Sequence, residues 1–321
     1  MGFSYKIFNF IRKYYMTITQ LNYVLALNKH KNFTRAAKTC MVSQPSLSMQ
    51  IQKLEEELEI SLFDRSKKPI KTTEIGKKLI NQFKVIISES EKVNDVIEYE
   101  KKKTFRKFNF GISSSFESSL LPLFLKPLKS KFEKINIDYF QSKNEEMLKL
   151  LKGNEVDFII TNSLINDTDL DVIVLYYEPL MILIPDDLKS NNTDIIELKN
   201  INTEKLIVPN NSDLRKTINK LFDFKKFNSK IRSNSLLSLF NLSYSGLGMT
   251  IVPFLNYRSL NKEKRNKVYH FKKPYPSREI SIVYKKNNLK KHLIIEMSEL
   301  IKSKLKSIET FTDVKIIDTI N

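Results

Sequence analysis

The residue types between positions 43 and 53 favour one kind of chemistry. Ser43 stands where a helix N-cap is expected, and Pro45 falls in the first turn, where the missing amide hydrogen costs nothing. Apolar residues at 47, 51, 54 and 58 predict one buried stripe. Hydrogen-bonding side chains lie elsewhere on the helix surface: Gln44, Ser46, Ser48, Gln50 and Lys53. Gln and Ser can bond to base edges, and Lys to guanine or phosphate, so this helix is suited to reading DNA; an ordinary solvated face is the alternative.

A shorter helix before it would set its position. The pattern predicts a helix from Thr34 to about Thr39, whose small Ala36-Ala37 pair lets another helix approach closely. Met41 and Val42 would cover the corner between the two helices. Two helices joined in this way form a helix-turn-helix, which places its second helix in the major groove of DNA.

Cations follow on a predicted hairpin. Arg65, Lys67, Lys68 and Lys71 surround Pro69, a turn residue. A hairpin here would flank the groove and bind phosphates. The net charge of +18 agrees with a partner made of phosphates, but Lys, Asn and Ile are frequent throughout the chain, so the total charge decides nothing by itself.

A long helix is expected from Thr73 onward. Its apolar residues recur at near-heptad spacing, interrupted at Ser90: Ile75, Leu79, Phe83, Ile86, Val93 and Ile97. Such a seam needs a partner, so we expect a second copy of the chain to pack on it; burial in the chain's own core is the alternative. Lys101, Lys102 and Lys103 would end the helix at its negative pole and begin a hinge.

Strands and helices alternate beyond the hinge. We expect strands at 108–112, 135–140 and 156–161 and helices at 120–132 and 145–152, an order that predicts a parallel sheet covered by helices. A second unit would run from about 179 to 271, with strands at 206–208 and 249–252 and helices at 214–224 and 236–245. A strand at 280–284 and a helix at 289–304 would return to the first lobe, leaving a cleft between two lobes.

Three serines are expected at that cleft. Ser113, Ser114 and Ser115 end the first strand and precede a helix whose amides would face the crevice, an arrangement suited to a carboxylate or another anion. The alternative is that these hydroxyls cap helices.

Several protein classes are disfavoured. The only histidines are His30, His270 and His292, which lie far apart, and no HExxH, Gly-x-Ser-x-Gly or paired-Cys spacing occurs, so we expect no enzyme, no cofactor and no metal site. A two-lobed solute-binding protein is the alternative function, but it would need a secretion signal and would not need the front helices. Residues 1–15 lack the apolar segment and cleavage site of such a signal.

Length and cysteine content set further limits. A chain of 321 residues should hold two or three domains, and no long apolar run suggests a membrane span, so we expect a cytoplasmic protein. A single cysteine excludes an internal disulfide. Cys40 falls at the helix corner, where we expect a buried apolar side chain instead of a reactive thiol.

The front of the chain resembles a known family. Residues 16–80 are similar to the winged helix-turn-helix of LysR-type transcriptional regulators, through the segments 33–37, 42–48, 51–58, 62–65 and 73–76. The resemblance implies DNA contacts from Gln44, Pro45 and Ser48 and a wing contact from Arg65. We assign the following residues to the same surface: Thr34, Arg35, Ser43, Ser46, Met49, Gln50, Lys53, Lys67, Lys68 and Thr72.

Two residues depart from the family pattern. Met49 stands where many members carry Arg, so one contact is either absent or replaced by an apolar contact with a thymine methyl group. Glu59 stands where the family usually ends the helix with Gly, and must close this helix less easily.

The rest of the chain resembles the same family. The implied fold is an N-terminal all-α winged helix-turn-helix with a dimerising linker helix, followed by a C-terminal α/β two-lobed effector domain that resembles periplasmic binding proteins. The implied boundaries are 16–75 for the DNA-binding domain, 76–103 for the linker and 104–310 for the effector domain, with lobe I at 104–175 and 277–310 and lobe II at 176–276. Residues 311–321 would be a tail, and residues 1–15 either an extension or the product of an upstream start codon.

The implied partners are double-stranded promoter DNA, a second or further copies of the chain as a homodimer or homotetramer, RNA polymerase, and a small-molecule or anionic effector.

Within the family the chain is most similar to the peroxide-sensing OxyR subgroup, in which sensing depends on a Cys directly before a Leu-Arg pair and a second Cys downstream. Here those positions hold Asp213 and Phe222, which cannot form a sulfenic acid or a disulfide. We therefore predict an effector bound by hydrogen bonds, or constitutive activity. The predicted effector residues are Ser114, Ser115, Asn144, Ser212 and Asp213.

Overall fold

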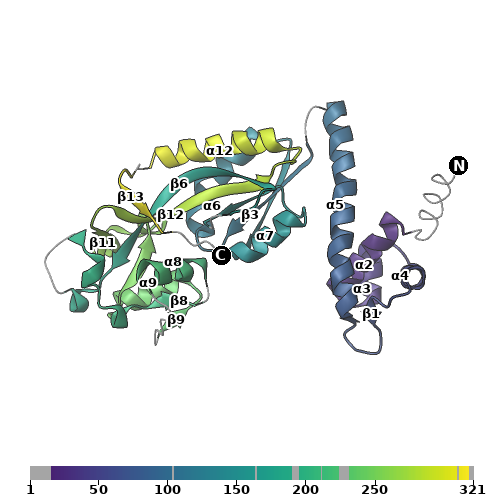
Figure 1. Cartoon of the computed structure of the whole chain (residues 1–321), viewed down its shortest axis with the longest axis horizontal. Coiled ribbons are helices and arrows are strands. Elements are labelled where there is room, and N and C mark those ends of the chain that lie inside the picture. The colour runs from purple at the N-terminus through teal and green to yellow at the C-terminus, as the bar shows by residue number, and fades with distance from the viewer. Residues whose placement is uncertain are drawn as a thin grey trace. The chain divides into compact units, whose positions relative to one another are not determined.

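The computed structural model describes residues 16–102, 105–162, 165–189, 195–210, 212–223, 231–308 and 311–317 (Figure 1). The chain divides into two compact units, one formed by residues up to 103 together with 153–155, the other by the rest.

The first unit is helical with a small hairpin. Its elements are α2 (Ile18–His30), α3 (Phe33–Thr39), α4 (Gln44–Leu58), β1 (Phe63–Asp64), β2 (Lys71–Thr72) and α5 (Glu74–Lys102). The two short strands pair antiparallel and form the wing. Leu47, Ile51 and Leu54 of α4 are fully buried in a core that also receives Ala36 and Ala37 of α3. The predicted stripe and the predicted close helix approach are both confirmed, with Leu58 half-buried against the same core.

Side-chain caps decide where these helices begin. The Asn32 side chain accepts a hydrogen bond from the Arg35 backbone N at 2.9 Å, and Ser43 Oγ accepts one from the Ser46 backbone N at 3.2 Å. At the other end of α4, Glu59 adopts the left-handed conformation with φ 55°, the position that glycine would fill more easily.

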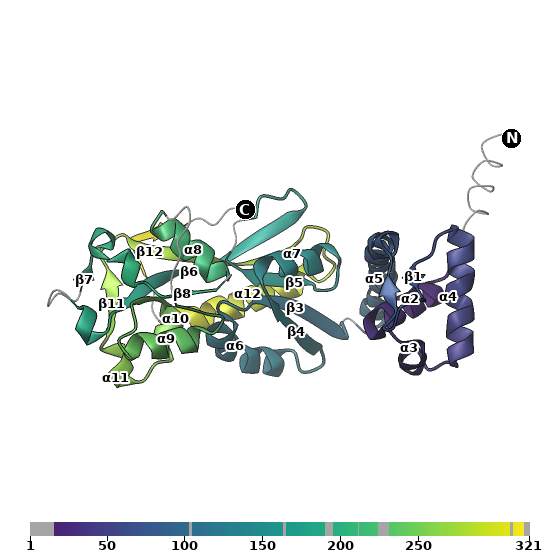
Figure 2. The ribbon, with the colours of Figure 1, turned by 90° about the horizontal axis from the view of Figure 1, so that it is seen from below.

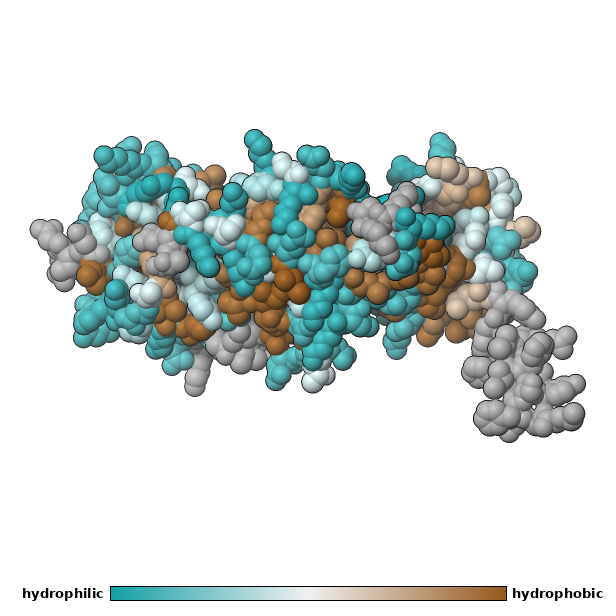
Figure 3. Space-filling view, turned by 90° about the horizontal axis from the view of Figure 1, so that it is seen from above, coloured by the Kyte–Doolittle hydropathy of each residue, from teal (hydrophilic) through white to brown (hydrophobic). Residues whose placement is uncertain are grey.

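Helix α5 runs for 29 residues without a break at Ser90. Its first half belongs to the core of this unit, because Ile80 and Phe83 are buried there. Farther along, apolar side chains remain exposed by 37% to 58%: Ile86, Val93, Val96 and Ile97. Figure 3 shows apolar side chains reaching the surface among hydrophilic ones. The first half of α5 is therefore buried in the chain's own core, whereas the second half leaves its apolar residues exposed. Packing of that exposed half on a second copy of the chain stays a prediction.

One mixed sheet runs through the second unit. Its strand order is β4-β3-β5-β12-β6-β11-β7, with β10 pairing to β6 and β13 to β12. The strands are β3 (Lys107–Ser113), β4 (Asn136–Ser142), β5 (Phe158–Thr161), β6 (Leu170–Leu183), β7 (Ile195–Ile196), β10 (Thr250–Pro253), β11 (Val268–Phe271), β12 (Tyr275–Lys285) and β13 (Val314–Ile316). The predicted parallel arrangement of β3, β4 and β5 is confirmed, and the returning strand β12 pairs antiparallel with both β5 and β6.

Strands β6 and β12 connect the two lobes. The sequence pattern did not predict β6. Its residues 170–174 and 176–179 pair with β12, its residues 180–183 pair with β10 of lobe II, and residues 181–183 pair also with β11. A strand that serves both lobes is buried on both faces for part of its length, so its sequence does not alternate and is hard to distinguish from a loop or a helix.

Helices cover the lobe I part of the sheet on both sides. They are α6 (Glu117–Lys131), α7 (Asn144–Lys152) and α12 (Lys291–Lys306). Successive residues of β3 point to opposite faces: the Phe110 ring lies 6.1 Å from the Phe124 ring of α6, whereas Gly111 faces Met147 of α7, where a Cβ would collide with the thioether. Helix α12 packs beside α6 (Figure 2).

Lobe II carries shorter elements. They are η1 (Asp186–Leu188), η2 (Leu198–Asn200), η3 (Thr203–Lys205), β8 (Val208–Pro209), α8 (Asp213–Leu221), β9 (Arg232–Ser233), α9 (Leu236–Tyr244), α10 (Phe254–Arg258) and α11 (Lys262–Arg265). The predicted end of the helix at 214–224 lies outside the described residues. Helix α8 begins with Asp213, which contacts Ser113 and Asn144 of lobe I.

Candidate DNA-binding surface and interlobe site

The outer face of α4 is polar with one apolar exception. With the buried stripe opposite, the exposed line along the helix consists of Pro45, Met49, Gln52 and Glu56. Gln44 and Lys53 are also exposed, and Ser48 is half-buried. In Figure 2, α4 lies at the outer side of its unit, with α2 between it and α5. Of the α4 residues predicted to contact DNA, Gln44, Pro45, Met49 and Lys53 are exposed.

These side chains differ in whether they already have partners. Among the described residues, the side chains of Gln44, Ser48 and Lys53 make no hydrogen bond or ion pair. Gln50 differs, because its Oε1 accepts a hydrogen bond from Gln20 Nε2 at 3.3 Å. Gln50 therefore holds α4 against α2, and the groups free to bind something else are Gln44, Ser48 and Lys53.

The α3 residues complete this surface from the side. Thr34 and Arg35 are exposed, and Ser43, besides capping α4, is exposed as well. Ser46 is half-buried, and its backbone amide is taken by the Ser43 cap.

Some of the wing residues predicted to contact DNA are exposed, and others are already bonded within their own unit. Lys67 and Lys68 are exposed. The Nζ atom of Lys67 lies 3.8 Å from Asp64 Oδ2, a long ion pair. Arg65 instead donates from Nη2 to Glu55 Oε2 at 2.6 Å, with its guanidinium 5.6 Å from the centre of the Phe33 ring. The Thr72 hydroxyl is occupied inside the unit, since it bonds to Asn28 Oδ1 at 2.8 Å and to Lys31 Nζ at 2.7 Å.

Glu55 is a residue that sequence reasoning missed. Besides pairing with Arg65, it accepts hydrogen bonds through Oε1 from the backbone N of Leu62 at 2.7 Å and of Phe63 at 3.1 Å. One carboxylate thus fixes the entry to the wing relative to α4. Nothing distinguishes it in the sequence from the two glutamates that follow.

A second cluster joins the two lobes of the other unit. Asp213, at the start of α8 in lobe II, accepts hydrogen bonds through Oδ2 from Ser113 Oγ and from the backbone N of Asn144, both at 3.1 Å. Ser113 lies at the end of β3, and Asn144 begins α7, so both donors belong to lobe I. All three residues are at most 5% exposed. The chain's own carboxylate therefore bridges the lobes.

This contact continues into the crossing strands. Ser113 Oγ lies 3.1 Å from Ser115 Oγ, which accepts a hydrogen bond from Arg278 Nη1 at 3.2 Å. Arg278 on β12 pairs with Glu178 on β6, with Nη2 to Oε2 at 2.7 Å, and the two side chains are 1% and 0% exposed. Glu178 Oε1 accepts from the Leu255 backbone N at 3.0 Å. A continuous hydrogen-bonded path thus runs from the lobe contact through the crossing strands to α10.

The structure brings some of the predicted effector residues together and separates others. Ser115, Asn144 and Asp213 come together, whereas Ser114 is exposed and Ser212 caps α8 by accepting from the Arg215 backbone N at 3.2 Å. The capping alternative fails for Ser113, Ser114 and Ser115, because the N-cap of α6 is Phe116 and no side chain caps that helix. Sequence reasoning missed Arg278 and Glu178 altogether. They lie 100 residues apart, and no local pattern connects them.

Around this site one more ion pair joins the lobes. Lys216 Nζ of α8 lies 2.7 Å from Glu145 Oε1 of α7. The hydrogen bond from Lys216, aided by its charge, lowers the pKa of the Glu145 carboxyl. Both side chains are substantially exposed, so this pair lies at the rim of the contact.

The remaining chemistry-bearing groups lie elsewhere. Cys40 is half-buried against the core of the first unit, and burial raises the pKa of its thiol. No group of three His, Cys, Asp or Glu residues in the described part of the chain is placed to hold a metal ion. None of the helices described there is long and apolar enough to cross a membrane.

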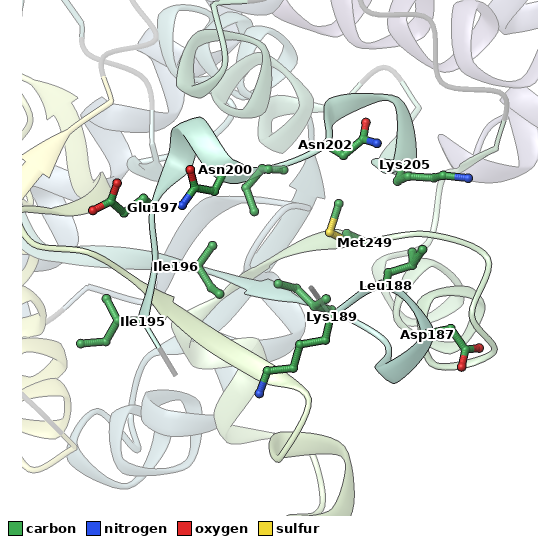
Figure 4. Close-up of a pocket in the computed structure, with 12 residues that line it drawn as sticks. Asp187, Leu188, Lys189, Ile195, Ile196, Glu197, Asn200, Asn202, Lys205 and Met249 are labelled. Atoms are coloured by element: carbon green, nitrogen blue, oxygen red, sulfur yellow. The ribbon is translucent and has the colours of Figure 1, made fainter. Parts of the chain in front are cut away.

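A separate pocket of about 340 Å³ opens in lobe II, away from the residues that bridge the lobes (Figure 4). Its floor is apolar and includes Ile184, Ile196 and Met249, and its rim carries charged side chains such as Asp187 and Lys205. Glu197, on the same rim, already pairs with Lys199 and Lys272, whose hydrogen bonds lower the pKa of its carboxyl to about 2.

Two family models match the chain. Residues 18–77 match the bacterial regulatory helix-turn-helix protein, lysR family, and residues 102–306 match the LysR substrate binding domain. Among curated relatives, the DNA-binding transcriptional dual regulator OxyR of Escherichia coli strain K12 is 26% identical over 90% of this chain and 96% of its own length. A hydrogen peroxide-inducible genes activator of Haemophilus influenzae is 24% identical over 91% of this chain and 98% of its own.

Solved structures share the fold. A full-length OxyR from Pseudomonas aeruginosa, carrying a cysteine-to-aspartate substitution, superposes with a TM-score of 0.74 at 24% identity, covering 90% of this chain and 95% of that one. Full-length BenM superposes with a TM-score of 0.55 at 22% identity, covering 93% of this chain and 99% of that one. The arrangement of a helix-turn-helix unit followed by a two-lobed domain is therefore shared with both.

Proposed function

Because the chain belongs to the LysR family of DNA-binding transcriptional regulators, we propose that it binds promoter DNA as a homodimer or homotetramer through α4 and the wing. The family-specific helix-turn-helix sets aside the alternative of a two-lobed solute-binding protein. The surface formed by Gln44, Ser48 and Lys53 supports base reading, because these side chains are accessible and have no partner within the described residues. Lys67 and Lys68 would bind phosphates beside the groove.

Oligomerisation would use the exposed half of α5. Regulators of this family act as oligomers, and the apolar residues from Ile86 to Ile97 offer a seam that the described part of the chain leaves exposed. Two recognition helices carried by one such pair would reach two half-sites, so the spacing of the half-sites would report the geometry of the dimer.

The signal is proposed to act at the bridge made by Asp213. One observation carries this step: a carboxylate from lobe II accepts two hydrogen bonds from buried groups of lobe I. In the OxyR subgroup this position is expected to hold the reactive thiol, so no sulfenic acid can form here. An effector would have to compete with Asp213 for Ser113 and for the Asn144 amide, and a polar or anionic small molecule fits those donors. Without such a molecule the lobes would stay in one arrangement and activity would be constitutive.

Further parts of the proposal follow from family membership. The protein would act in the cytoplasm, where its DNA lies, would catalyse no reaction, and would alter transcription through contact with RNA polymerase. Its only cysteine, Cys40, lies in the DNA-binding unit and has a raised thiol pKa, which disfavours the thiolate that peroxide would oxidise.

DNase footprinting of the full-length protein on duplex DNA from upstream of its own gene tests both the proposed DNA binding and the proposed role of Asp213. We expect a specific, salt-resistant complex whose footprint is the same with and without hydrogen peroxide. Asp213→Ala removes the acceptor of both interlobe bonds and should change the length of the footprint, whereas Asp213→Asn keeps an acceptor oxygen and should change it less. Lack of a specific complex would contradict DNA reading. A footprint unaffected by Asp213→Ala would show that Asp213 does not transmit the signal to DNA binding. A peroxide-dependent change of the footprint that disappears in Cys40→Ser would show that the thiol of Cys40 senses peroxide.

A further inference from the structure

Two methionines protrude from the helix-turn-helix. Met41 is 93% exposed and Met49 is 62% exposed, although the surface around them is polar. Met41 lies in the turn before α4, where it adopts φ 55° and its backbone N donates to Lys38 O at 3.2 Å. Met49 lies one helical turn after Pro45. A large apolar side chain that stays exposed in the free protein is favoured in the bound state if a partner covers it with an apolar group.

Met49 lies on the one line of α4 that points directly away from the core. Leu47, Ile51 and Leu54 are 0% exposed on the inner side, and a period of 3.6 residues places Pro45, Met49 and Gln52 opposite to them. When such a helix enters a major groove, its outer line faces the floor of the groove, where the base edges lie. Met49 is therefore closer to the bases than a side chain on the flanks of the helix.

The chemistry of the groove floor restricts what Met49 can contact. Every base pair presents hydrogen-bonding groups there, and a thioether is a poor partner for them. Thymine alone among the four bases adds an apolar group, its C5 methyl. A flexible, unbranched side chain can cover that methyl without requiring one fixed geometry.

We propose that Met49 selects thymine in the operator by covering its C5 methyl group in the major groove. The proposal rests on the DNA-binding function and adds to it the identity of one base in each half-site. Gln44, five residues earlier at the start of the helix, would read another base by hydrogen bonds, so α4 would combine polar and apolar readout.

Uracil tests this contact, because it pairs like thymine but lacks the methyl group. Duplexes that bind the full-length protein are first enriched from a random pool, and each thymine in the enriched sequence is then replaced by uracil in turn. At one position per half-site we expect about fourfold weaker binding at fixed salt, the effect of uncovering one methyl group. Met49→Gln should show no difference between the two bases at that position.

Met41→Gln is the matched control, since it removes another exposed methionine that lies outside α4. This variant should keep the uracil penalty in full. The proposal is overturned if uracil is neutral at every position, or if Met49→Gln retains the penalty. A pool that yields no enriched sequence would overturn the DNA-reading function itself, and the two failures are thereby told apart. Circular dichroism confirms that each variant is folded.

Discussion

The outer face of α4 and the contact between the lobes use similar side chains for opposite purposes. On α4, Gln44 and Ser48 are accessible and lack a partner within the described residues. Between the lobes, Ser113, Asn144 and Asp213 are buried and bonded to one another. Serine and amide groups therefore indicate a binding surface in one place and an internal connection in the other.

The difference follows from the cost of burying polar groups. A polar atom removed from water must find a partner, so a buried cluster is completed by the chain itself. An exposed one is satisfied by water and can exchange that water for a ligand. Accessibility together with the lack of an internal partner, and not residue type, identifies the groups that await an external molecule.

The largest expected effect concerns the buried pair behind the lobe contact. Arg278→Met leaves the Glu178 carboxylate buried without its cation, and we expect the free energy of unfolding to fall by about 3–5 kcal/mol. Chemical denaturation measures this loss. The double variant Arg278→Met with Glu178→Met should recover most of it, because no charge is then left unpaired. If the double variant is as unstable as the single one, loss of the charge partner is not the cause.

An intermediate effect is expected for the exposed surface. Gln44→Ala should weaken binding to the specific site by about 1–3 kcal/mol and leave non-specific, salt-sensitive binding nearly unchanged, since only base reading is lost. Fluorescence anisotropy on specific and unrelated duplexes measures both. Gln50→Ala is the comparison, because its side chain is already bonded to Gln20. Equal loss of specific binding in the two variants would refute the distinction between partnered and free side chains.

The smallest effect is expected at the rim of the lobe contact. Lys216→Gln breaks an exposed pair with Glu145, so the midpoint of thermal unfolding should change little, and the change should vanish at high salt. Because Lys216 holds the pKa of Glu145 below its usual value, the pair stabilises the fold above that usual value and ceases to do so as the pH falls through the lowered one. The difference between wild type and variant should therefore shrink toward acidic pH. A constant difference would mean that the variant acts through something other than this charge pair.

Prediction from sequence succeeded where the determinants are local. The cap at Ser43, the stripe of Leu47, Ile51 and Leu54 and the long helix from Glu74 all depend on residues within a few turns of one another. It failed for β6, because a strand shared between two lobes carries no alternation of its own. It gave no direction for β12, which pairs antiparallel with β5, since the direction in which a distant strand returns is not written in any nearby residue.

The sequence by itself determined a helix-turn-helix with an accessible polar helix, a two-lobed domain behind it, and a single cysteine, Cys40, that excludes an internal disulfide. Those features depend on residue type, residue count and short spacing. Only the tertiary structure decided that Gln50, Arg65 and Thr72 are engaged within their own unit, and that Asp213 meets Ser113 and Asn144 across the lobes. Whether a polar group has a partner depends on what folding brings beside it, and those neighbours come from up to a hundred residues away.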